Sequence, residues 1–113
     1  MPDIEAFRKG LLDLLDSIAA GGTDIYGGFT EILCMWFDDY WGRKARELID
    51  DGVINEGEYE ILNRFSEKFR IAYPKGTRDL EQDMRKLQGY STWMSVVRAA
   101  NQAKAELDAL ASS

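Results

Sequence analysis

A broad apolar arc within residues 25–49 constrains the fold of this chain more than any other stretch. Successive residues of an α-helix point about 100° apart, so side chains three or four positions apart share a face. The apolar side chains of the stretch then cover almost half of the helix circumference; they are Ile25, Phe29, Ile32, Leu33, Trp36, Phe37, Tyr40, Trp41 and Leu48. A helix that faces a single neighbour has a narrower stripe. The arc therefore predicts one helix over 25–49 that other helices contact on two sides.

Helical spacing of apolar residues continues on both sides of this stretch. It predicts a first helix over 4–18, which Gly21 and Gly22 end, with Gly10 leaving room for a close neighbour. It also predicts a helix over 56–72 and a last helix over 77–112. With 113 residues, we expect one all-α domain spanning 1–113. The predicted architecture is a bundle of four main helices, or five if the last is broken near Gly89, with the second helix central.

The turn between the second and third helices carries the sharpest local signal. Gly52 can adopt the left-handed conformation that ends a helix. Asn55 and Glu58 have the spacing of a capping box, in which each side chain accepts a hydrogen bond from the other residue's backbone. Ile54 and Tyr59 stand at the positions of a hydrophobic staple. Together they predict a tight turn between antiparallel helices.

The same turn resembles the second half of an EF-hand calcium loop. Gly52, Ile54 and Glu58 match the glycine, the hydrophobic position and the bidentate glutamate of that loop. The alignment, however, places Ile49 at the third loop position, where an oxygen ligand is needed. The turn also resembles the short helical hairpins of small bacterial domains. We therefore expect no metal and no cofactor.

The residue types needed for common catalytic sites are scarce. The chain has no histidine, which removes the usual general base, the usual zinc ligand and every histidine-containing triad. The single cysteine, Cys34, lies at the margin of the apolar arc and is expected to be a buried, unreactive thiol. Asp38 and Asp39 are adjacent, so on a helix they do not converge on one substrate atom. We expect no catalytic residues and no enzyme activity.

Charge and composition exclude several classes of partner. A formal net charge of −6 disfavours nucleic acids and anionic membranes, because both attract basic proteins. Apolar runs are too short to span a membrane, and the acidic residues in 1–20 are unlike a signal peptide. One cysteine fits a reducing compartment. The expected location is the cytoplasm.

An acidic cluster provides the leading functional hypothesis. Residues 47–60, called here the acidic turn, contain six acidic residues and no basic one: Glu47, Asp50, Asp51, Glu56, Glu58 and Glu60. Helix-end chemistry on a solvated turn is one explanation, and a docking patch for a basic protein is the other. The function expected is a non-catalytic protein-interaction module, of the inhibitor, immunity or adaptor type, that uses this turn or an aromatic patch.

Aromatic residues provide the alternative hypothesis. Five of them at helical spacings could line a pocket between helices: Trp36, Tyr40, Trp41, Tyr90 and Trp93. That pocket would make the chain a small-molecule binding or sensing bundle. The same residues could instead be ordinary core or could form an interface between copies in a homo-oligomer. Sequence alone leaves these alternatives open.

Overall fold

The computed structural model describes residues 4–22, 28–41, 45–72 and 91–112, and all regular structure within these ranges is helical. Its elements are α1 (Ile4–Ala19), α2 (Gly28–Cys34), the π-helix η1 (Met35–Tyr40), α3 (Glu47–Asp50), α4 (Glu56–Ala72) and α6 (Ser91–Ser112). Four of these helices have seven or more residues, which confirms the predicted all-α bundle. None of the helices described is both long and apolar enough to cross a membrane.

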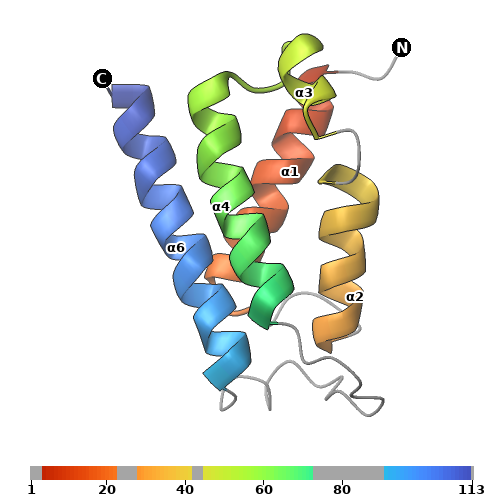
Figure 1. Ribbon diagram of the computed structural model, residues 1–113, viewed down its shortest axis with the longest axis vertical. Coiled ribbons are helices and arrows are strands. Elements are labelled where there is room, and N and C mark those ends of the chain that lie inside the picture. Colours follow the sequence, from red (N-terminus) through yellow and green to blue (C-terminus); the bar gives the residue numbers. More distant parts are fainter. Residues whose placement is uncertain (1–3, 23–27, 42–44, 73–90, 113) are drawn as a thin grey trace.

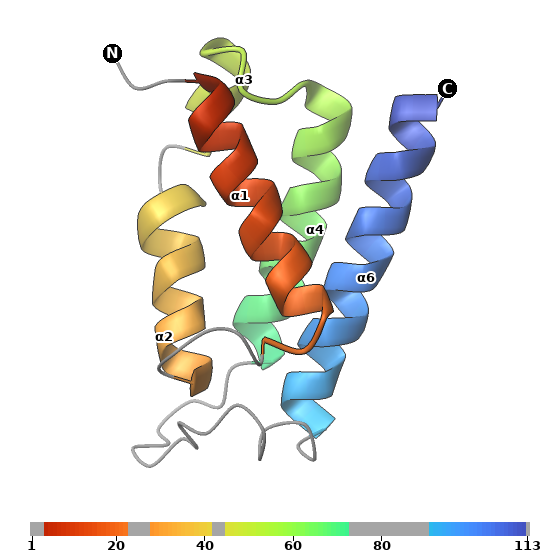
Figure 2. The same ribbon diagram turned by 180° about the vertical axis from the view of Figure 1, so that it is seen from behind.

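The long helices pack around a shared core (Figure 1). α4 packs along α6, and α1 packs against α6 as well. The α2–η1 segment lies on the opposite side of the bundle from α6 in both views (Figures 1 and 2). α1 and α6 lie close together where α1 ends, since Asn101 in the middle of α6 donates a hydrogen bond to the Ala19 carbonyl, and the two helices diverge towards the other end of the bundle. That other end carries α3 and the start of α4.

The predictions for α1 and α4 are confirmed. α1 ends before Gly21 and Gly22, which have φ angles of 107° and 73° that only glycine adopts readily. Its side chains at positions 11, 14, 15 and 18 are buried, as the helical spacing predicts. α4 has the predicted bounds and buries Leu62, Phe65 and Phe69. The proposed helix start at 77 and any break near Gly89 lie outside the described residues.

The prediction of one helix over 25–49 is wrong. α2 passes into η1, where the Trp41 N–H donates to the Trp36 carbonyl, 2.7 Å away and five residues earlier. α3 begins separately at Glu47. Residues five apart point about 140° apart on an α-helix, whereas the wider π-turn brings them towards one side. The indoles of Trp36 and Trp41 consequently stack, with centroids 6.2 Å apart, and both are buried.

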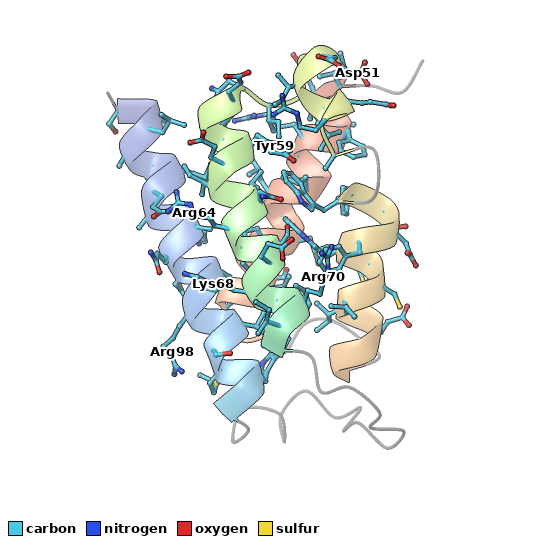
Figure 3. All side chains as sticks on the ribbon, in the orientation of Figure 1. Asp51, Tyr59, Arg64, Lys68, Arg70 and Arg98 are labelled. Atoms are coloured by element: carbon cyan, nitrogen blue, oxygen red, sulfur yellow. The ribbon has the colours of Figure 1, made fainter. Side chains whose placement is uncertain are left out.

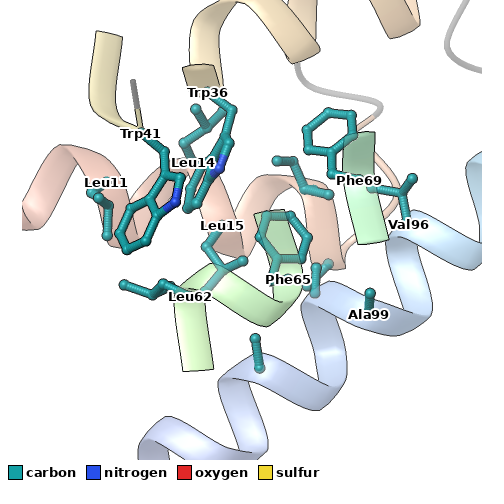
Figure 4. Close-up of a cluster of buried hydrophobic side chains, with 14 of the residues drawn as sticks. Leu11, Leu14, Leu15, Trp36, Trp41, Leu62, Phe65, Phe69, Val96 and Ala99 are labelled. Atoms are coloured by element: carbon teal, nitrogen blue, oxygen red, sulfur yellow. The ribbon is translucent and has the colours of Figure 1, made fainter. Parts of the chain in front are cut away.

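The α2–η1 side chains contact helices on two sides, as the apolar arc predicts (Figure 4). Trp36 and Phe65 of α4 pack edge to face, with ring centroids 5.0 Å apart. Its indole N–H donates to Ser66 Oγ at 2.8 Å, and that hydroxyl in turn donates to a backbone carbonyl one turn earlier. On the α1 side, Tyr40 packs edge-on against Phe7 at 5.2 Å. This segment therefore supplies the aromatic centre of the core from one side of the bundle.

Cys34 is exposed, so the expectation of a buried thiol is wrong. It lies two residues from both Ile32 and Trp36, which are fully buried. Two residues correspond to about 200° around a helix, so Cys34 points away from the core when those two point into it.

Candidate functional site

Within the acidic turn, the chain reverses direction sharply after α3. Gly52 has a φ angle of 80°, as predicted, which is the left-handed conformation. The N–H groups of Val53 and Ile54 both donate to the Leu48 carbonyl, at 2.9 and 3.3 Å. The side chains of Val53 and Ile54 are buried, so the reversal is attached to the core.

The predicted capping box is present at the start of α4. Asn55 Oδ1 accepts a hydrogen bond from the Glu58 N–H at 2.8 Å, and Glu58 Oε1 accepts one from the Asn55 N–H at 3.0 Å. These bonds satisfy two backbone donors that would otherwise lack partners at a helix start. The turn therefore enters α4 in one defined conformation.

Arg8 of α1 donates hydrogen bonds to this turn, and the spacing of residues in the sequence did not predict that contact. Its Nη1 and Nη2 donate to the two carboxylate oxygens of Glu58, at 3.0 and 2.6 Å, and Nη1 also donates to the Val53 carbonyl at 2.9 Å. Hydrogen bonding to Arg8 lowers the pKa of Glu58, although burial of the carboxyl opposes this. The same bond raises the pKa of Arg8. The turn is thus fixed both to its own helix and to α1.

Five of the six acidic side chains remain available on this fixed turn. They are exposed and form no ion pair with any cation in the ranges that the structure describes: Glu47, Asp50, Asp51, Glu56 and Glu60. Glu58 differs because its carboxylate is half-buried and bound by Arg8. The structure therefore divides the cluster into one internal carboxylate and five external ones.

Three of the described basic side chains lie along α4 and α6, away from the acidic turn. Figure 3 shows Asp51 at the α3 end, whereas Arg64, Lys68 and Arg98 follow α4 and α6 towards the opposite end. The Arg64 guanidinium is paired with Glu106 of α6 at 3.2 Å. Close to the acidic turn, the Arg46 guanidinium lies 5.0 Å from the centroid of the Tyr59 ring. The distribution of charge along the bundle is therefore uneven.

The aromatic residues of the alternative hypothesis occupy different positions. Trp36, Trp41 and Trp93 are buried, and Tyr40 is half-buried. The Trp93 indole N–H donates to the Gly21 carbonyl at 3.0 Å, beyond the end of α1. Tyr90 lies outside the described residues. The structure thus stacks Trp36 on Trp41 within the core and anchors Trp93 where α1 ends.

No family model, curated protein or solved structure matches this chain. Within the described ranges, no group of three or more acidic or cysteine side chains is arranged to hold a metal ion. Asp38 and Asp39 are both exposed on η1. The chemistry that the acidic turn can perform is acceptance of hydrogen bonds and ion pairs from cationic groups.

Proposed function

We propose that this chain is a non-catalytic cytoplasmic interaction module that uses the acidic turn to bind a basic surface of another protein. One observation carries the proposal: five exposed carboxylates, unpaired within the described residues, stand on a turn fixed by a capping box and by Arg8. A pre-ordered turn loses little conformational freedom when a partner binds. Clustered charge of one sign also accelerates encounter with a partner of opposite charge.

The aromatic alternative has less support. Trp36 and Trp93 are fully buried and their indole N–H groups already have acceptors within the protein. A small molecule could reach the Trp36 indole only if the packed core side chains around it, including the stacked Trp41, moved apart. A docking role for the acidic turn requires no such rearrangement, because its carboxylates already face solvent.

The test compares two variants with the same loss of charge. The turn variant combines Asp50→Asn, Asp51→Asn and Glu60→Gln; the control variant combines Glu31→Gln, Asp38→Asn and Asp39→Asn on α2–η1. All six side chains are exposed. Each variant is immobilised and used to capture proteins from an extract of the source cell at low and at high salt.

The proposal predicts that wild type and the control variant retain the same partner at low salt. The turn variant should lose that partner, and high salt should release it from wild type, because exposed charges are screened. Retention of the same proteins by the turn variant would contradict the proposal.

A further inference from the structure

α1 and α6 diverge towards the end of the bundle that carries the acidic turn (Figure 2). Two cavities adjoin the turn at this end. The first, of about 780 Å³, is open and lies between the turn and the end of α6. The second, of about 260 Å³, lies between α1 and α6. Arg8, Glu58 and Ala111 line both cavities. The two cavities are therefore neighbours that share these three residues, and together they are called here the α1–α6 groove.

The lining of the groove is substantially apolar. Leu12, Leu15 and Leu107 line the second cavity, and Leu12 and Leu107 are only half-buried. Ile49 and Ile54 line the first cavity. Apolar side chains of a partner would cover Leu12, Ile49 and Leu107, which are half-buried, and remove their remaining exposed surface from water. This burial supplies the affinity that exposed ion pairs lack.

The charges that line the groove favour a cationic partner. Its two cations are already neutralised: Arg8 binds Glu58, and Lys104 Nζ lies 3.2 Å from Asp16 Oδ1. The carboxylates of Glu56 and Asp108 are exposed and have no cation partner among the residues described. The charges that remain unpaired in the groove are therefore negative.

We infer that the α1–α6 groove binds a basic, amphipathic segment of the partner protein. Its apolar side chains enter the groove, while lysine or arginine side chains reach Glu56 and Asp108. This inference rests on the proposed function, in which the neighbouring acidic turn makes the first electrostatic contact. Helical segments with one apolar face commonly bind grooves of this kind. An acidic segment would meet like charge, and so would a second copy of this chain, with its net charge of −6.

The direct test uses a fluorescent synthetic peptide with leucine and lysine at helical spacing, titrated with the full chain and followed by anisotropy. Two comparison peptides separate the contributions: an oligolysine of the same charge without leucines, and a leucine–glutamate peptide of the same pattern. We expect the leucine–lysine peptide to bind about tenfold more tightly than the oligolysine, because only it fills the groove. The acidic peptide should not bind.

A matched pair of variants locates the peptide on the protein. Ala111→Trp fills the groove at the residue shared by both cavities, whereas Ala109→Trp places the same side chain on α6 outside their lining. Both alanines are exposed, so the melting temperature should not change. Ala111→Trp should weaken binding about tenfold or more and Ala109→Trp should leave it within about twofold. Glu56→Gln with Asp108→Asn should weaken it mainly at low salt.

Equal binding of the oligolysine, or unchanged binding by Ala111→Trp, would overturn the groove inference. The capture experiment keeps the two proposals distinct. If the turn variant loses the partner and Ala111→Trp retains it, the acidic turn binds the partner and the groove does not. If neither variant loses the partner, both proposals fail.

Discussion

At the scale of single residues, Gly10 of α1 lies where the Tyr40 side chain leaves no room for a Cβ. A Cβ at this position would lie 2.6 Å from the Tyr40 hydroxyl and 3.3 Å from two of its ring carbons. The Tyr40 ring also packs against Phe7, which restricts how far it can move. The sequence predicted a close neighbour at Gly10 and could not identify it, because Tyr40 is 30 positions away along the chain.

Gly10→Ala should therefore destabilise the protein. Alanine gains up to about 1 kcal/mol over glycine inside a helix, but overpacking costs about 1–3 kcal/mol. Removing the hydroxyl with Tyr40→Phe should relieve part of the clash, so a double-mutant cycle in urea should give a coupling energy of about 1 kcal/mol. Equal stabilisation by Gly10→Ala in both backgrounds would show that the contact is absent.

At the scale of elements, the start of α4 shows which contacts the spacing of neighbouring residues can predict and which it cannot. The capping box was predictable because Asn55 and Glu58 are three residues apart, and both of its hydrogen bonds are present. Arg8 was not predictable, since nothing in local spacing links residues 50 positions apart. Glu58, which the sequence assigned to a partner-binding surface, therefore also stabilises the contact between α1 and α4.

The stability contributed by Glu58 should depend on pH. Pairing with Arg8 holds its folded pKa below the usual value of about 4.3, so the contribution is fully present above that pH. It is lost as the pH falls through the lower, folded pKa. Glu58→Gln keeps the cap but loses the charge, and should cost about 1 kcal/mol at neutral pH because Arg8 is partly exposed.

Urea unfolding of wild type and Glu58→Gln across acidic to neutral pH measures this difference. Glu56→Gln is the control, because Glu56 is exposed and unpaired within the described residues, and its effect should be small throughout. A difference between wild type and Glu58→Gln that stays constant down to the lowest pH would contradict the role given to Arg8.

The η1 element shows where helical periodicity misleads. An arc drawn at α-helical spacing placed Trp36 and Trp41 on the buried side, and both are buried. It could not show that the backbone widens into a π-turn to align them, since periodicity assumes a constant turn. It also extended the helix to residue 49, although α3 is a separate element that begins at Glu47.

At the scale of the whole molecule, ion pairs within the described part of the chain join α1, α4 and α6 to one another. Arg8 and Glu58 join α1 to α4, and Lys104 and Asp16 join α6 to α1. A third pair joins α4 to α6 between Arg64 and Glu106. These ion pairs connect helices within the protein. None of them involves the five exposed carboxylates of the acidic turn, which can therefore bind cations of a partner.

The fold class was predictable because it depends on apolar spacing within each helix. The groove was not, because it depends on the angle between α1 and α6 and on the position of the turn between them. The acidic cluster was visible in the sequence. Its division into an internal Glu58 and five external carboxylates required the structure.

We propose that the acidic turn is the surface that binds a basic partner. Amide chemical-shift mapping of the isotope-labelled chain during titration with the leucine–lysine peptide tests it most directly. We predict the largest shifts in residues 47–60, with further shifts in 8–16 and 104–111, and smaller shifts at high salt. Amide shifts that are largest in α2–η1, or that are spread evenly over all exposed acidic residues, would contradict this proposal.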